Sequence, residues 1–411
     1  MRVPFDAASV REFRYLDVTV DAASGTVTSR WSLDDDLIFE EIVHVPDVPP
    51  ERWQDPSVMR AVTLLFLLSG VSYYKAAAPP VIDLGDTPVR SHDRAMLEQF
   101  FVDGLGEYAF VNDLDLTGIS FVGGRDVDAD PRASYQPNLD RPLIAFGGGI
   151  DSIVTLESLK ARVAEPTLFV LQRGSTSFQV IDDAAAASGV PVIGASQHLD
   201  EKILRSGALG FRNGHVPVTG VLSAIAVLTA LLHGHGAVVM SNEWSASIGN
   251  TEHAGRSVNH QWSKSLAFED LFRAALAAGI DEPPAYYSYL RARSEVWVAQ
   301  RMAAATEYHS VFRSCNRSFA IDPAQRLDRW CGRCDKCVFI NLVLAPFMSR
   351  AQLAAVFGGS EPLDALRNEE ALRTLVGASP DAKPFECVGD VDECRVAAVL
   401  AADRPERADQ H

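Results

Sequence analysis

The spacing of hydrophobic and polar positions changes near residue 140. Before it, short runs such as Leu16-Asp17-Val18-Thr19-Val20 alternate apolar with polar residues, as strands with one exposed face do, and a polar, turn-rich stretch closes the region. Beyond it, apolar strand-like runs alternate with helical patterns, which is typical of an open, mainly parallel α/β sheet. We therefore expect an N-terminal α+β domain over residues 1–138, an α/β domain over 139–350, and a helical C-terminal segment with a tail over 351–411.

Apolar runs and helical periodicity give the order of elements in the α/β domain. In its first helix, Ile153, Leu156 and Leu159 recur at helical spacing. Strands are expected at 143–146, 167–171, 191–194 and 237–240, and helices at 151–163, 181–188 and 217–233. Because parallel sheets bind ligands at the carboxyl ends of their strands, we expect a site along residues 147–152 and 241–250.

Two longer apolar runs resemble membrane spans, at 61–74 and 216–232. The first is too short to cross a bilayer, and Pro217, Gly220 and three hydroxyl side chains interrupt the second. We expect both to be buried core helices. The first residues of the chain contain no apolar signal-peptide segment, so we expect a cytoplasmic protein with no membrane partner.

The composition indicates a folded protein with a large core and an acidic surface. Of the 411 residues, 47% are hydrophobic, and 37 Lys and Arg stand against 54 Asp and Glu, a net charge of −17. Nonspecific nucleic-acid binding depends on clustered Lys and Arg, so we expect no nucleic-acid partner. A local basic pocket for one small anion remains compatible with this charge, and nothing in the composition indicates an oligomeric state.

Three glycines join the first strand and helix of the α/β domain, in Phe146-Gly147-Gly148-Gly149-Ile150-Asp151-Ser152. Backbone amides of such a turn approach a phosphate closely, the helix N-terminus adds partial positive charge, and Asp151 is suited to hold the Mg²⁺ of a nucleotide. The alternative is an ordinary tight turn in which Asp151 or Ser152 caps the helix.

This segment resembles the SGGxDS loop of the PP-loop ATP pyrophosphatases, which adenylate carbonyl or carboxylate oxygens. Gly147 stands where that family has Ser, so one hydroxyl contact to pyrophosphate is absent. The resemblance implies that ATP binds at Phe146, Gly147, Gly148, Gly149, Asp151 and Ser152.

Four of the six cysteines form the group Cys315-x15-Cys331-x2-Cys334-x2-Cys337. Two successive two-residue spacings direct three thiolates at one ion, and Cys315 completes a tetrahedral shell. We prefer a structural zinc, similar to that of the deazaguanine-nitrile-forming PP-loop enzymes. An iron–sulfur cluster and unliganded core cysteines are the alternatives. Cys387 and Cys394 have no assigned role.

Polar residues also follow the fourth strand and begin the next expected helix. Asn242 and Glu243 lie in the strand-end segment, and Ser257 is the expected N-cap of a helix that places His260 and Lys264 on one face. A His/Lys pair in a strand-end cleft is suited to proton transfer, whereas a solvated helix surface is the ordinary alternative.

Together, these strings resemble the ATP-dependent UDP-N-acetylmuramoyl-L-alanyl-L-glutamate epimerases of cell-wall synthesis, the MurL family. The resemblance covers about residues 140–350 and rests on the following strings: 146–152, Asn242-Glu243, Gly249-Asn250, 258–265, 286–295, 312–317 and 330–347. It implies a small-molecule substrate, the UDP-MurNAc-dipeptide, whose terminal L-glutamate is adenylated by Mg·ATP and epimerised, with release of AMP and pyrophosphate.

Site residues follow from the resemblance and from residue chemistry. The catalytic candidates are Glu243, His260 and Lys264, of which Lys264 alternatively holds phosphate. The substrate-binding candidates are Asn242, Asn259, Arg291, Arg293, Arg313 and Arg317, the arginines because they bind carboxylates and diphosphates in a bidentate manner.

Three other functions remain open. A PP-loop amidotransferase or nitrile-forming ligase would pass the same carboxyl-adenylate to ammonia. A tRNA-thiolation enzyme would use the cysteines for an iron–sulfur cluster, although the net charge of −17 opposes tRNA binding. A nucleotide-binding regulatory protein would show no turnover.

Overall fold

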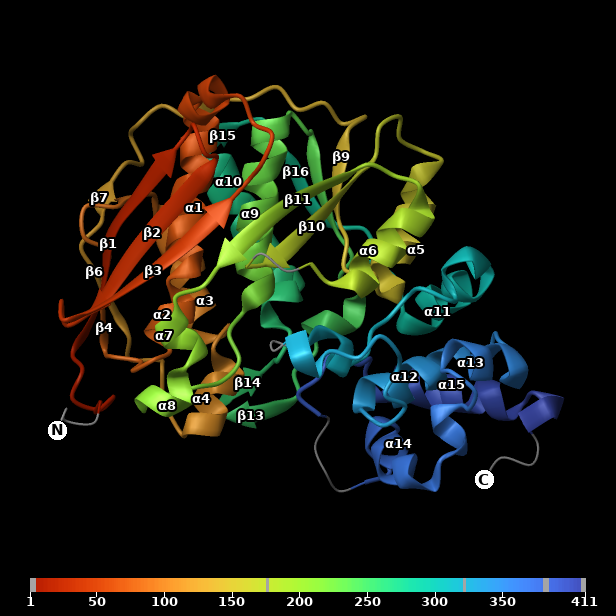
Figure 1. Ribbon diagram of the computed structural model, residues 1–411. Coiled ribbons are helices and arrows are strands. Elements are labelled where there is room, and N and C mark those ends of the chain that lie inside the picture. The colour runs from red at the N-terminus through yellow and green to blue at the C-terminus, as the bar shows by residue number, and fades with distance from the viewer. Residues whose placement is uncertain (1–4, 175–176, 321–322, 380–383, 408–411) are drawn as a thin grey trace.

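A computed structural model describes residues 5–174, 177–320, 323–379 and 384–407. Ten strands form one mixed sheet, in which neighbours are parallel from β16 to β11 and from β1 to β6, and antiparallel from β11 to β1 (Figure 1). In spatial order the strands are β16 (Ala285–Ser288), β12 (Ala237–Met240), β9 (Pro142–Ala145), β10 (Thr167–Arg173), β11 (Val192–His198), β3 (Leu37–His44), β2 (Thr26–Leu33), β1 (Glu12–Asp21), β4 (Val81–Asp83) and β6 (Ser120–Val122). The expected α/β class with a large, mostly parallel sheet is confirmed.

Helices cover both faces of the sheet (Figure 1). The main helices are α1 (Pro56–Ser69), α3 (Ser91–Val102), α5 (Ile150–Lys160), α6 (Gln179–Ser188), α9 (Val218–His233), α10 (Leu266–Gly279), α11 (Glu295–Ala304), α12 (Asp335–Leu344), α13 (Arg350–Val356), α14 (Glu369–Leu375) and α15 (Val391–Ala402). The strands and helices expected between 143 and 240 are confirmed to within a few residues, and so is the helical character of the chain beyond 350.

The central strands divide their side chains between two hydrophobic cores. Leu143 and Val238 belong to the core that contains α1, α9 and α10, whereas the adjacent Ile144 and Val239 belong to the core that contains α5, α6 and α11. Successive side chains of a strand point to opposite faces, so continuous apolar runs are the signature of strands covered on both faces. This is why the runs at 143–146 and 237–240 predict their strands well.

The two long apolar runs are core helices, as expected. By length and composition, Pro56–Tyr74 would suffice to cross a membrane, but 83% of its most apolar window is buried inside the protein. Helix α9 is likewise buried along most of its length and packs against α1.

The sheet continues across the expected domain boundary at residue 138. His44, Val43 and Ile42 of β3 pair antiparallel with Ser196, Gln197 and His198 of β11. Residues from both sides of the boundary also share one hydrophobic core. The N-terminal third therefore supplies five of the ten strands of the sheet, and the α/β region supplies the other five, whose carboxyl ends are where the site is expected.

One expected helix start is wrong. Ser257 lies in β14 (Arg256–Val258), paired with Glu252, and α10 begins only at Leu266, where the Ser265 hydroxyl accepts a hydrogen bond from the Phe268 amide at 3.3 Å. The Asn259 side chain accepts from the Gln261 amide at 2.8 Å, and such Asx turns compete with helix formation. His260 and Lys264 are therefore not helical i,i+4 neighbours.

Candidate active site

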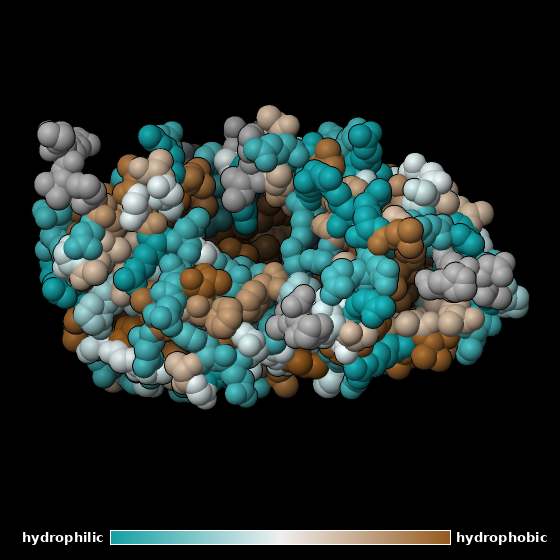
Figure 2. Space-filling view, turned by 90° about the horizontal axis from the view of Figure 1, so that it is seen from below, coloured by the Kyte–Doolittle hydropathy of each residue, from teal (hydrophilic) through white to brown (hydrophobic). Residues whose placement is uncertain are grey.

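A cavity of about 380 Å³ lies at the carboxyl ends of the central parallel strands. These ends point downward in Figure 1, and the view from below in Figure 2 shows a hollow in the middle of that face, apolar in its depth and surrounded by polar residues. Its lining includes the predicted residues Phe146, Gly147, Gly149, Asp151, Ser152, Asn242, Lys264 and Arg313, together with Lys336 and Cys387. Segments far apart in sequence thus meet at the expected edge of the sheet.

The glycine loop leads directly from β9 into α5. Gly149 is the N-cap of the helix, and the Ser152 hydroxyl donates to the Gly149 carbonyl at 3.0 Å, so neither Asp151 nor Ser152 caps the helix. Gly148 has a φ of +70°, and a Cβ there would meet the Val180 carbonyl oxygen at 3.2 Å. This backbone leaves the first turn of α5 open to the cavity, as a phosphate cradle requires.

Three carboxylates converge beside the loop. Asp151, Glu243 and Glu295 each place an oxygen within 4.8 Å of the others, and both glutamates are buried. Burial and the charge of Glu243 raise the pKa of Asp151 and of Glu295 well above their usual values. Within the part of the chain that the structure describes, the buried Asp151 Oδ1 has no hydrogen-bond partner.

This carboxylate cluster fits a hard divalent cation. Oxygen ligands are what Mg²⁺ prefers, and a cation would relieve the mutual repulsion of three acidic groups while providing the unpartnered Asp151 oxygen with a ligand. Sequence reasoning assigned Asp151 to Mg²⁺ but missed Glu295. That residue follows Ser294, the N-cap of α11, so in the sequence it reads as an ordinary acidic residue in a first helical turn.

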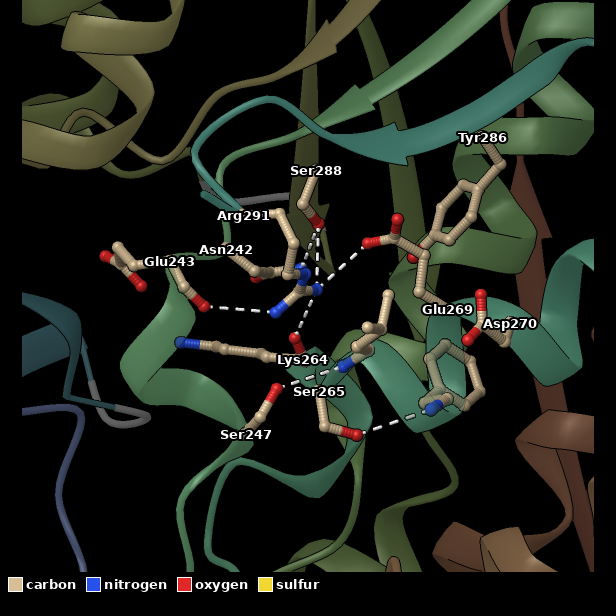
Figure 3. A network of polar contacts seen from close by, with 12 residues as sticks. Asn242, Glu243, Ser247, Lys264, Ser265, Glu269, Asp270, Tyr286, Ser288 and Arg291 are labelled. Carbon is tan, nitrogen blue, oxygen red and sulfur yellow. Dashed lines mark hydrogen bonds and ion pairs between the residues drawn. The ribbon is translucent and has the colours of Figure 1, made fainter. Parts of the chain in front are cut away.

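Arg291 holds the two segments that carry Glu243 and Lys264 (Figure 3). Its guanidinium donates to the Glu243 carbonyl at 3.0 Å and to the Lys264 carbonyl at 2.8 Å, and it pairs with Glu269 at 2.9 Å. Figure 3 shows Lys264 extending away from this network, on the same side as the Glu243 side chain. Arg291 therefore positions the site backbone through its two terminal nitrogens, whereas its Nε has no partner among the described residues.

Lys264 and His260 converge on a residue that the sequence left unassigned, Cys387. Lys264 Nζ lies 3.2 Å from Cys387 Sγ, Nδ1 of His260 hydrogen bonds Glu107, and interaction with Cys387 raises the pKa of His260. Glu107 belongs to α4 (Gly106–Asn112) of the N-terminal region. Although they share no helix face, His260 and Lys264 thus do lie together.

The ionisation of this group follows from its charges. Burial would lower the pKa of His260, but its interactions with Cys387 and Glu107 outweigh burial and raise that pKa to about 9. Burial would also lower the pKa of Lys264, which Cys387, Glu243 and Asp151 instead raise. For Cys387, burial opposes ionisation, yet Lys264, His260 and Lys336 lower the pKa to about 6.

The other predicted substrate residues are spread over the surroundings. Arg313 lines the cavity, and its backbone amide donates to the Gly148 carbonyl at 3.2 Å. Arg293 stacks over the Trp297 ring at 4.8 Å, and Arg317 is exposed.

The two predicted asparagines have protein partners. Asn242 donates to the Ser288 hydroxyl at 2.9 Å, and Asn259 donates to the Ala246 carbonyl at 2.9 Å. Asn242 also lines the cavity, whereas Asn259 is engaged in the turn that replaces the expected helix.

The four clustered cysteines form one compact sulfur group. The sulfurs of Cys315, Cys331, Cys334 and Cys337 all lie within 4.8 Å of one another, with 3.4 Å from Cys334 to Cys337 and 3.7 Å from Cys331 to Cys337. Four thiolates on a single tetrahedral ion, with bonds of about 2.3 Å, lie about 3.8 Å apart, which matches this spacing. The four cysteines expected to bind a metal therefore lie close enough together to bind one ion.

This cysteine group supports the glycine loop. Ser314 precedes the first cysteine, and a Cβ on Gly149 would meet Ser314 Oγ at 2.9 Å. The segment from Arg313 to Cys315 therefore packs directly against the loop, so a metal at the cysteines would fix one wall of the cavity.

Comparison with known proteins identifies similar sequences over almost the whole chain. The MurL N-terminal domain matches residues 4–289, and the MurL C-terminal domain matches residues 311–411. A protein of Xanthomonas oryzae pv. oryzae named UDP-N-acetyl-alpha-D-muramoyl-L-alanyl-L-glutamate epimerase is 38% identical over 98% of this chain and 88% of its own length. Proteins of the same name from Micromonospora sp. and Salinispora tropica are 39% and 38% identical, over 97% and 95% of this chain and 88% and 85% of their own lengths.

Proposed function

The chain belongs to the MurL family, and we propose that it epimerises the terminal L-glutamate of UDP-MurNAc-L-Ala-L-Glu to D-glutamate with consumption of ATP. The names of the relatives support the epimerase over the amidotransferase, thiolation and regulatory alternatives. The observation that carries the ATP dependence is that a glycine loop at a helix N-terminus and Asp151, one member of the carboxylate cluster, line the same cavity.

Adenylation solves the chemical difficulty of this reaction. Removing a proton from the carbon beside a carboxylate would add negative charge to a group that is already negative. A mixed anhydride between that carboxyl group and AMP is an activated acyl group, so its enolate forms far more easily. Pyrophosphate leaves when the mixed anhydride forms, and hydrolysis of the anhydride after reprotonation on the other face gives D-glutamate and AMP.

Residues in the cavity and beside it fit these requirements. We assign the phosphates to the amides of the glycine loop and the N-terminus of α5, a β-strand–loop–helix arrangement that supports a PP-loop type of ATP site. Asp151, Glu243 and Glu295 would hold Mg²⁺, which supplies charge neutralisation at the phosphates. Arg313, Lys264 and Lys336 contribute positive charge to the same cavity.

We assign a structural zinc to the four cysteines. A single ion accounts for the short spacing of all four sulfurs, whereas an iron–sulfur cluster divides its cysteines among two or four irons, and sulfurs on different irons lie farther apart. The role of this zinc is to hold the segment from Arg313 to Cys315 against the glycine loop.

The proposal is tested by incubating the protein with ATP, Mg²⁺ and UDP-MurNAc-L-Ala-L-Glu in D₂O. We expect pyrophosphate and AMP to form only when the dipeptide substrate is present, and D-glutamate to carry deuterium at its α-carbon without any need for ammonia. Asp151→Ala should abolish AMP formation while the protein remains folded. Epimerisation without ATP, or formation of an amide, would contradict the proposal.

A further inference from the structure

We propose that the thiolate of Cys387 is the base that removes the α-proton of the adenylated glutamate, an inference that rests on the function proposed above. Cys387 lines the same cavity as Asp151 and the glycine loop. It is brought there by residues 384–390 of the C-terminal region, which directly precede α15.

Several contacts fix the thiol in this position. Lys264 Nζ lies 3.2 Å from Cys387 Sγ, and Lys336 Nζ donates to the Cys387 carbonyl. The Pro384 carbonyl of the same segment accepts from the Asn250 side chain at 3.0 Å. The segment is thus tied to both α12 and the strand-end loop, so the sulfur is held at the wall of the cavity.

The charged groups around the sulfur form a relay. Glu107 hydrogen bonds Nδ1 of His260, and His260 and Cys387 interact so that each favours the charged form of the other. A carboxylate that orients an imidazole, which in turn activates a thiol, is the arrangement that proteins use to maintain a reactive thiolate. Lys264 adds a second positive charge, 3.2 Å from the sulfur. Consistent with this geometry, the pKa of Cys387 is lowered to about 6.

The neighbouring groups are less suited to the same task. His260 and Lys264 have raised pKa values, so both are protonated at neutral pH and cannot accept a proton. Asp151 points an unpartnered oxygen into the carboxylate cluster that fits Mg²⁺. Glu386, which also lines the cavity, accepts a hydrogen bond from Asn316 at 2.6 Å. Of the described cavity groups, the Cys387 thiolate is therefore the one placed and ionised for proton abstraction.

The proposed step is a proton transfer without net oxidation. The bond between the α-carbon and its hydrogen breaks, and an S–H bond forms at Cys387. The electron pair moves into the acyl-adenylate to give its enolate, and Lys264 and Arg313 supply positive charge to the cavity in which that negative charge develops. A proton from a second donor on the opposite face then gives the D configuration.

The test compares Cys387→Ser with the wild type in D₂O, with Cys394→Ala as the matched control because Cys394 is a fully buried thiol and not part of the described cavity lining. Pyrophosphate formed in the first turnover reports adenylation, and deuterium in recovered glutamate of either configuration reports proton abstraction. We expect Cys387→Ser to retain pyrophosphate formation and to lose deuterium incorporation by roughly 10²–10⁴-fold. Cys394→Ala should retain both.

The outcomes separate the two proposals. If the wild type forms no pyrophosphate with the dipeptide substrate, the proposed function is wrong. If the wild type is active and Cys387→Ser still incorporates deuterium into L-glutamate at the wild-type rate, another group such as Glu386 is the base and this inference is overturned. A covalent thioester on Cys387, detected as a mass increase of the intact protein, would overturn it as well.

Discussion

The charges that surround Cys387 come from three different parts of the chain. Lys264 lies in the 3₁₀ turn Trp262–Lys264, His260 in the turn before it, and Lys336 in α12, while Glu107 stands behind His260. The positive groups favour the thiolate, and Glu107 favours the imidazolium. The sulfur should therefore ionise at a lower pH than an ordinary thiol.

This arrangement predicts how the reactivity of Cys387 depends on pH. The thiolate is lost as pH falls through about 6, and the supporting imidazolium is lost as pH rises through about 9. Alkylation of Cys387 by iodoacetamide, followed by peptide mass spectrometry, should be half-maximal near pH 6. His260→Gln removes a positive neighbour and should shift that midpoint upward. An unchanged midpoint would show that His260 does not stabilise the thiolate.

The shape of the turn between β9 and α5 depends on the backbone conformation of one residue, Gly148. At a φ of +70°, Gly148 adopts a backbone that costs other residues about 1–2 kcal/mol. Gly148→Ala should lower the free energy of unfolding by about that amount, and a displaced cradle should reduce pyrophosphate formation by roughly 10–100-fold. Chemical denaturation and the pyrophosphate assay measure the two effects.

Gly147 provides the matched control for that variant. A Cβ there meets no atom within 4 Å, and the PP-loop pattern has Ser at this position. Gly147→Ser should therefore leave stability unchanged and preserve adenylation. If Gly147→Ser and Gly148→Ala changed the free energy of unfolding and pyrophosphate formation equally, the positive φ of Gly148 would not explain the effect.

The helices and strands near the site could be predicted because each is defined by local spacing. The runs at 143–146 and 237–240 are covered on both faces. Three consecutive glycines mark the turn between β9 and α5. The helix expected at Ser257 was wrong because a strand pairing and the Asn259 turn, which depends on one side-chain hydrogen bond, replace it.

Two residues of the candidate site could not be predicted from the sequence, for a different reason. Glu295 and Cys387 carry no local signature, since Glu295 reads as a helix start and Cys387 stands apart from the other cysteines. Packing of segments distant in sequence brings Cys387 to the cavity and Glu295 to the carboxylate cluster beside it. The positions of Asp151, Lys264 and Arg313 at one cavity followed from the strand-end rule together with the family resemblance.

For the whole molecule, the pairing of β3 with β11 makes the N-terminal third part of the same folding unit. Without residues 1–138, β11 would present an unpaired edge and α9 would expose the surface that packs on α1. A fragment of residues 139–411 should therefore aggregate or bind hydrophobic dyes, whereas the full chain should unfold in one transition seen alike by circular dichroism and tryptophan fluorescence. A fragment that folds cooperatively by itself would contradict this expectation and favour independent domains.

Lys264 interacts both with the proposed base and with the carboxylates of the proposed Mg²⁺ site, so a substitution of Lys264 would affect both at once. Its ammonium group interacts with Cys387 on one side and with the charges of Glu243 and Asp151 on the other. A substitution that improved one half of the reaction would disturb the other, so few evolutionary routes lead away from lysine here. When a mutant library is selected for new substrates, substitutions should accumulate at the rim of the cavity while Lys264 stays unchanged. The effects of mutations at Lys264 should depend on the other residues of the site more strongly than those at any other position.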